Sequence, residues 1–178
     1  FMFVEISFIQ KIILLLENPS YAVAVLLTSI LISSGIGSLL SYRTAIIRMP
    51  HALLALSIFV IAYSIFLPDI INAISPYPMP VKIIAVFLVF MPPGILMGIP
   101  FPTGLKVLGQ TDDSYIPWAW AINGCFSVLA PVLAVLLAIM TGFRAVLWMG
   151  AAAYLAAFII FSFESLRPLE QKPRELSE

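Results

Sequence analysis

Long apolar runs are the feature that most limits what this chain can fold into. They are separated by short polar or proline-rich stretches and together fill most of the 178 residues. A helix that crosses the hydrocarbon core of a bilayer needs about 20 mostly apolar residues. The sequence predicts six such helices, at residues 1–16, 21–40, 52–67, 81–98, 117–140 and 144–163.

The composition agrees with a membrane location. Hydrophobic residues make up 62% of the chain and charged residues 10%, and the mean hydropathy is +1.09. A soluble domain has about 45–50% apolar and about 25% charged residues. A single water-soluble core cannot bury this much apolar surface, so the excess must face lipid or a large partner. The predicted main partner is therefore a lipid bilayer.

The apolar runs are predicted to be helices and not strands. They are too long for barrel strands and lack the alternation of such strands. Backbone groups in lipid must also be paired within their own segment. We therefore expect an all-α, polytopic bundle at residues 1–164 and a polar cytoplasmic tail at residues 165–178. We also expect a piece of a longer protein, in which the first helix begins upstream of Phe1.

Basic residues in short loops predict the orientation, because they are enriched on the cytoplasmic side. With alternating helices, the residues on one side are Arg43, Arg48, Lys106, Arg167, Lys172 and Arg174. The other side receives only Lys82 and Arg144. This difference places both termini in the cytoplasm.

The first helix carries polar residues on two sides. Ser7, Gln10 and Lys11 share one face through their three- and four-residue spacing, and Glu5 lies on another. Such a helix is expected inside the bundle. Glu5 either pairs with a neighbouring helix or lies near the interface, or it is a buried anion that faces a cavity. Glu5, Gln10 and Lys11 are therefore candidate substrate-binding residues.

The fourth helix contains residues that predict a break, namely Pro92, Pro93, Gly94, Pro100 and Pro102. Each proline lacks an amide hydrogen, so several carbonyl groups lose their helical donors. Transporters use broken helices of this kind to bind substrates. Proline kinks also occur in spans without such a role, and the sequence leaves both interpretations open.

The fifth helix begins with two tryptophans and contains an amide. Trp118 is expected to anchor the helix at the membrane interface. Trp120, Asn123 and Ser127 share one face, and a buried amide such as that of Asn123 needs partners. Asn123 either bridges to the freed carbonyl groups of the fourth helix or faces a cavity together with Glu5. Trp120 and Asn123 complete the candidate substrate-binding set.

The second helix ends in small residues that are typical of helix packing. Ser34, Ser38 and Ser41 fall on one face with Gly37 beside them. Small side chains at this spacing let two helix backbones approach closely. The surface is a candidate for packing within the chain or for a homo-oligomer.

Several classes of function lack their residues. The net charge is zero, so the chain has no basic field for nucleic acid. The single Cys125 allows no internal disulfide, and His51 is expected at the interface. Phosphate-binding, dinucleotide-binding and zinc-protease motifs are absent from the sequence. We therefore expect no catalytic constellation, no metal site and no cofactor in this chain.

Four segments in order resemble the membrane part of bacterial spermidine-synthase-like fusion proteins. They are FVEISFIQK at residues 3–11, SGIGSLLS at 34–41, GIPFPTGLK at 98–106 and WAWAING at 118–124. In that family a hydrophobic multi-helix region is joined to an aminopropyltransferase-like domain of the Rossmann type. The membrane part is similar to half of a major facilitator transporter, and the turn at residues 37–43 loosely resembles a loop of that superfamily.

The resemblance implies a polyamine context, a bacterial inner membrane and a fused or associated soluble enzyme domain. Two functions then compete. The domain binds or moves a polyamine-like small substrate, or it is a passive anchor that holds an enzyme at the membrane and oligomerises through residues 34–41. An intramembrane enzyme has little support from the residues present.

Overall fold

The computed structural model describes residues 1–43 and 49–166, and within them it contains helices and no β-strand. The all-α prediction is therefore confirmed for this part of the chain. In order, the helices are α1 (Met2–Leu16), α2 (Pro19–Arg43), α3 (Met49–Ile74), α4 (Met79–Met97), α5 (Pro100–Thr111), the short 3-10 helix η2 (Asp113–Tyr115), α6 (Ile116–Thr141) and α7 (Phe143–Leu166).

Five helical segments are long and apolar enough to cross a membrane, which indicates an integral membrane protein. They are Pro19–Ser41, Met49–Ile74, Met79–Gln110, Asp113–Thr141 and Phe143–Phe163. The remaining predicted span, α1, has 15 residues. At about 1.5 Å per residue it is shorter than the hydrocarbon core of about 30 Å. Five of the six predicted spans therefore have sufficient length in the described residues.

Two predicted boundaries are wrong, and both involve proline. The third run was expected to stop at Pro68, but α3 continues through it to Ile74. The fourth run was expected to end in a non-helical segment, but Pro100 and Pro102 lie in the first turn of α5. The first amide hydrogens of a helix have no intrahelical partner, so proline costs little there.

The position of the break in the fourth predicted span also differs from the expectation. Pro92, Pro93 and Gly94 lie inside the continuous helix α4, which ends at Met97. The interruption falls at Gly98 and Ile99, before α5 begins. Consecutive prolines therefore do not interrupt the helix here.

The carbonyl group freed by Pro93 has a partner on α3. Pro93 removes the helical hydrogen bond to the Val89 carbonyl group, four residues earlier. The Tyr63 hydroxyl donates a hydrogen bond to that same carbonyl oxygen. Nearby, the Ser29 hydroxyl of α2 donates to the Phe87 carbonyl oxygen at 3.0 Å. Neighbouring helices thus donate to two carbonyl groups of α4, and one of them is a group that the proline pair has freed.

Small residues bring α2 and α4 into backbone contact. A Cβ atom added to Gly37 would lie 2.0 Å from the Ile95 carbonyl oxygen. A Cβ atom on Gly98 would lie 2.0 Å from the Ser34 carbonyl oxygen. A Cβ atom on Gly94 would lie 2.7 Å from the Cβ atom of Ser33. The predicted packing surface of α2 therefore includes a contact within the chain, and Gly37 is not free to contact a second copy.

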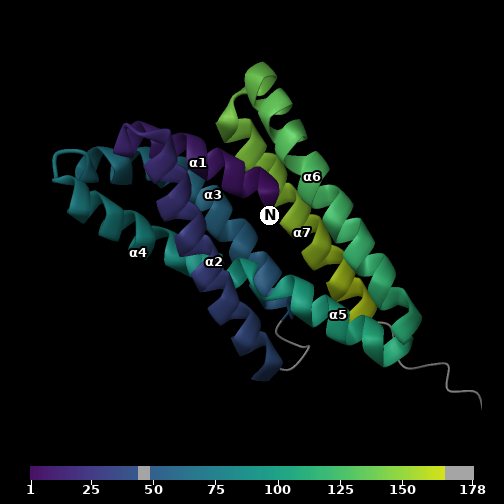
Figure 1. The fold of residues 1–178 in the computed structure, drawn as a ribbon. Helices are drawn as coiled ribbons and strands as arrows, with labels where there is room; N and C mark the ends of the chain where they lie inside the picture. Colours follow the sequence, from purple (N-terminus) through teal and green to yellow (C-terminus); the bar gives the residue numbers. More distant parts are fainter. Residues whose placement is uncertain (44–48, 167–178) are drawn as a thin grey trace, which may run out of the picture.

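Helix α1 lies in the core of the molecule. Val4, Phe8 and Ile12 are fully or almost fully buried. The Phe8 ring packs against the rings of Phe90 and Tyr63, with centroid distances of 4.8 and 5.8 Å. Figure 1 shows the N-terminal end of α1 near the middle of the molecule, where α6 and α7 pass beside it. The expectation that the first helix is internal is confirmed.

The two ends of the molecule differ in the charges that the structure describes. Lys82 lies near the start of α4, and its ammonium group donates to the Leu15 carbonyl oxygen at 3.2 Å, at the C-terminal end of α1. Arg144 is at the start of α7, with its guanidinium carbon 5.4 Å from the centre of the Trp148 ring. Lys106 lies on α5, toward the end of the molecule where α2 and α7 finish (Figure 1). Arg48 and the tail residues Arg167, Lys172 and Arg174 lie outside the described residues.

Candidate functional site

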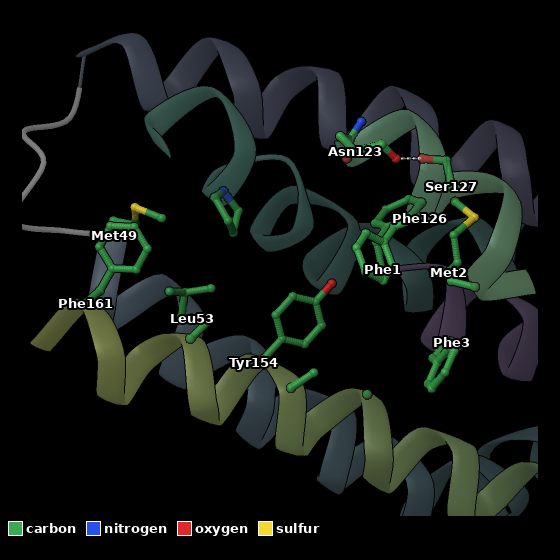
Figure 2. Close-up of a pocket in the computed structure, with 15 residues that line it drawn as sticks. Phe1, Met2, Phe3, Met49, Leu53, Asn123, Phe126, Ser127, Tyr154 and Phe161 are labelled. Atoms are coloured by element: carbon green, nitrogen blue, oxygen red, sulfur yellow. Dashed lines mark hydrogen bonds between the residues drawn. The ribbon is translucent and has the colours of Figure 1, made fainter. Parts of the chain in front are cut away.

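A cavity of about 630 Å³ lies between the N-terminal end of α1 and helices α3, α5, α6 and α7. Figure 2 shows the side chains around it. Most of them are apolar or aromatic. The lining residues are Phe1, Met2, Phe3, Met49, Leu53, Pro100, Asn123, Phe126, Ser127, Ala130, Gly150, Ala153, Tyr154, Ala157 and Phe161.

The packing of three helices sets one end of the cavity. Ala134 and Ala138 of α6 meet Val146 of α7 in a small buried cluster, against which Phe3 and Ile6 of α1 pack. A Cβ atom on Gly150 would lie 2.8 Å from a methyl carbon of Val4, so α1 and α7 touch at this point. Beyond these contacts the cavity extends between residues 123–130 of α6 and 150–161 of α7.

The walls carry aromatic rings and a few neutral polar groups, and the lining residues include no lysine or arginine. The Tyr154 side chain projects from α7, with its hydroxyl group pointing into the cavity (Figure 2). Ser127 uses its hydroxyl to donate to the Asn123 carbonyl oxygen at 2.7 Å. The Asn123 amide and the Tyr154 hydroxyl therefore remain available to a molecule in the cavity.

Glu5 does not line the cavity but lies near Tyr154, which does. It follows Phe1 by four residues and so lies one helical turn further along the same face of α1. Its side chain is 5% exposed. Within residues 1–43 and 49–166 no side chain donates a hydrogen bond to its carboxyl group or forms an ion pair with it. Its carboxyl group is close enough to the Tyr154 hydroxyl for the two to interact electrostatically.

The structure brings together only part of the predicted binding set. Asn123 lines the cavity and Glu5 is adjacent to it. Gln10 and Lys11 are half-buried further along α1 and do not line the cavity. Trp120 is 56% exposed and packs on Phe101 of α5, with a centroid distance of 5.0 Å. Gln10, Lys11 and Trp120 are therefore not placed together at one site.

The proposed bridge from Asn123 to the fourth span is also absent. Asn123 is exposed to the cavity, and the carbonyl group freed by Pro93 receives its hydrogen bond from Tyr63 instead. Asn123 is among the residues that line the cavity, and Glu5 is not, so the predicted cavity shared by Asn123 and Glu5 stays a prediction.

Sequence reasoning missed Tyr154, the polar group that points into the cavity. A signal was present in the sequence, because Tyr154 follows the small residues at positions 150–153 in an otherwise apolar span. Small residues let a neighbouring helix approach, and a hydroxyl group beside them needs a partner or a cavity. The described residues contain no group of three or more His, Cys, Asp or Glu that could hold a metal ion.

Comparisons with known proteins add no relative to this description. No family model, no curated protein and no solved structure matches the chain. The resemblance to spermidine-synthase-like membrane proteins therefore stays a prediction from the four sequence segments.

Proposed function

We propose that this chain is an integral membrane domain that binds a small organic cation, of polyamine-like chemistry, in the cavity between α1 and α7. The observation that carries the proposal is an aromatic cavity of about 630 Å³ with the buried carboxyl group of Glu5 near Tyr154, one of its lining residues. Ligand sites commonly have volumes of about 300–1,000 Å³. The cavity is therefore large enough for a small organic molecule.

The character of the walls favours a cation with a carbon skeleton. The rings of Phe3, Phe126, Tyr154 and Phe161 line the cavity. Aromatic faces attract ammonium groups, and they do so more strongly when water is excluded. The methylene segments of a polyamine would contact the apolar side chains. An anionic ligand finds no lysine or arginine side chain among the lining residues.

Glu5 supplies the complementary charge in this proposal. A carboxylate held away from water is unfavourable unless a positive group accompanies it. An ammonium group in the cavity, beside Tyr154, would provide that compensation. The attraction is strong because the surroundings have a low dielectric constant.

The wider setting is proposed from the sequence. The chain would lie in a bacterial inner membrane with both termini in the cytoplasm, fused to or associated with an aminopropyltransferase-like domain. The four segments that resemble spermidine-synthase-like proteins support this setting. Lys106 also lies at the end of the molecule that is predicted to be cytoplasmic, whereas Lys82 and Arg144 lie at the other end. This agrees with the proposed orientation, because cytoplasmic loops are richer in basic residues.

A passive anchor is the second candidate. The positions of Gln10, Lys11 and Trp120 away from the cavity favour it, because Asn123 is then the one residue of the five predicted binding residues that lines the cavity. In this alternative the cavity has no functional occupant. The domain would only hold an enzyme at the membrane.

Binding of spermidine by Glu5→Gln tests the proposal. We expect the protein, reconstituted in lipid nanodiscs, to bind spermidine in equilibrium binding measurements. Removal of the charge should raise Kd roughly tenfold, since the attraction between two unit charges at such a site is worth about 1–4 kcal/mol and about 1.4 kcal/mol corresponds to a factor of ten. The control is Glu17→Gln, which changes an exposed glutamate at the other end of α1. Equal affinities of Glu5→Gln and the unchanged protein would reject the role of Glu5, and a lack of binding by the unchanged protein would favour the anchor.

A further inference from the structure

The burial of α6 is uneven along its length. All of its residues are described, and only Ala134 and Ala138 are buried. Residues 116–130 include none that is buried, and Trp118, Phe126 and Val128 are 69%, 61% and 70% exposed. The two buried alanines therefore anchor the C-terminal half of the helix, and residues of the other half line the cavity.

The half formed by residues 116–130 is attached to the rest of the molecule at its two ends. At the C-terminal side, Ala134 and Ala138 pack with Val146 of α7 and with α1. At the N-terminal side, the Trp120 ring meets the Phe101 ring of α5 edge-on, with a centroid distance of 5.0 Å and an interplanar angle of 84°. Between these attachments lie Asn123, Phe126 and Ser127, which line the cavity.

A proline stands at the boundary between the two halves. Pro131 lies inside α6, three residues before the first packed alanine. It removes the hydrogen bond that the Ser127 carbonyl group would accept, and proline is a common cause of helix bending. A groove formed by Ile6, Pro131, Val132, Val135 and Leu136 leaves open space beside this position. The helix can therefore change its bend here without a clash at that groove.

We propose that residues 116–130 of α6 form a gate at the cavity, which pivots at Pro131 and is held against α5 by the contact between Trp120 and Phe101. The inference rests on the proposed function, because it describes how a ligand reaches the same cavity. The ring contact itself is weak enough to open by thermal motion. The C-terminal half around Ala134 and Ala138 stays in place while residues 116–130 move.

Cys125 makes this motion measurable. It is the single cysteine of the chain, it is exposed, and it lies within the gate. A nitroxide on Cys125 and a second one at Ile160→Cys, an exposed position of α7, report the gate distance by pulsed electron spin resonance in nanodiscs. A fixed pair, Ile58→Cys with Ile160→Cys in a Cys125→Ser background, is the control because α3 and α7 are packed together.

We expect two distance populations for the gate pair without ligand and a shift to the shorter one with spermidine. Trp120→Ala should favour the longer distance even without ligand and raise the rates of spermidine binding and release roughly two- to tenfold. Pro131→Ala should narrow the distribution, because it restores the helical hydrogen bond. The fixed pair should not change.

The outcomes separate this inference from the proposed function. If spermidine binds but the gate distance is one narrow peak in all variants, the gate is rejected and the binding site stands. If spermidine does not bind, the proposed function fails. The effect of Trp120→Ala on the ligand-free distance then still decides whether the gate exists.

Discussion

Tyr63 illustrates how a single side chain can replace a backbone hydrogen bond that a proline removes. Its hydroxyl donates to the Val89 carbonyl group, whose helical donor Pro93 has removed. Its ring also packs against Phe8 and Phe90. A carbonyl group without a donor is expensive in lipid, where no water replaces it. Tyr63 thus contributes a hydrogen bond to the backbone of α4 and ring contacts to the core.

The substitution Tyr63→Phe separates these two contributions. It keeps the ring and removes the donor, so the Val89 carbonyl group is left without its partner. We expect a loss of about 1 kcal/mol in the free energy of unfolding. A hydrogen bond between membrane helices contributes about 0.6 kcal/mol, and a buried polar group without a partner costs about 1–3 kcal/mol. Unfolding in detergent mixtures measures it. Tyr21→Phe, at an exposed tyrosine, is the control, and an equal effect of both changes would contradict the argument.

The candidate site shows which residues a sequence can place and which it cannot. Glu5 and Asn123 stood out because polar groups are rare in apolar spans, and both lie at or beside the cavity. Gln10 and Lys11 stood out for the same reason but lie elsewhere on α1. Rarity identifies an unusual residue, but it does not say which other residues are near it. That depends on how α1, α6 and α7 pack, which no local pattern contains.

Helices α2 and α4 approach so closely that glycine is required at Gly37, where an added Cβ atom would lie 2.0 Å from a backbone oxygen. The serines and glycines near the end of α2 predicted a packing surface, and the structure identifies α4 as the neighbour of Gly37. Sequence spacing gives the face of a helix that packs, because side chains three and four residues apart lie together. It does not identify the partner helix, since every span is about equally apolar.

Two glycines on α2 provide a matched test of this contact. In Gly37→Ala the new methyl group would lie 2.0 Å from the Ile95 carbonyl oxygen, so the helices must separate. We expect a loss of about 1–3 kcal/mol in the free energy of unfolding, as for other overpacked positions. In Gly35→Ala the methyl group meets open space, and no loss is expected because alanine favours a helix. Equal destabilisation by both substitutions in detergent unfolding would show that the backbone contact is not important.

Helix α5 was not predicted, and the reason is general for membrane chains. Pro100 and Pro102 were interpreted as the end of a span, although a proline at the start of a helix has the opposite meaning. The distinction depends on whether the preceding residues end a helix, and Gly98 does so here. In α3 the error was the reverse, because Pro68 was interpreted as an end but lies inside the helix. Proline marks a lost hydrogen bond, and the neighbouring elements decide whether the helix continues.

At the scale of the whole molecule, the apolar runs were sufficient to predict the helical class. Backbone groups in lipid have one local solution, so length and hydropathy identify a span without knowledge of its neighbours. The same reasoning is weaker for α1, because its 15 residues are embedded among other helices. Its place in the core follows from contacts with Phe90 and Gly150, and these depend on the assembled bundle.

The orientation of the bundle makes a prediction that also tests the membrane assignment. Ser75 directly follows the helix Met49–Ile74, in the short connection before the segment Met79–Gln110, and Gln110 is the last residue of that segment. If the segment crosses the bilayer, the two residues lie on opposite sides. Single cysteines at these two positions, in a Cys125→Ser background, should differ in their reaction with a maleimide that does not cross membranes. Because basic residues favour the cytoplasm, Ser75→Cys should react in intact cells and Gln110→Cys only in inverted vesicles.

The pattern of labelling separates the possible errors. If Gln110→Cys reacts in intact cells and Ser75→Cys does not, the bundle is inserted with the opposite orientation. If both react from the same side, the segment Met79–Gln110 does not cross the bilayer. The backbone polar groups at Gly98 and Ile99 would then not lie in the hydrocarbon core and could form hydrogen bonds with water. The cavity beside Pro100 would in that case open to water, and the aromatic walls would no longer provide a low-dielectric site for a cation.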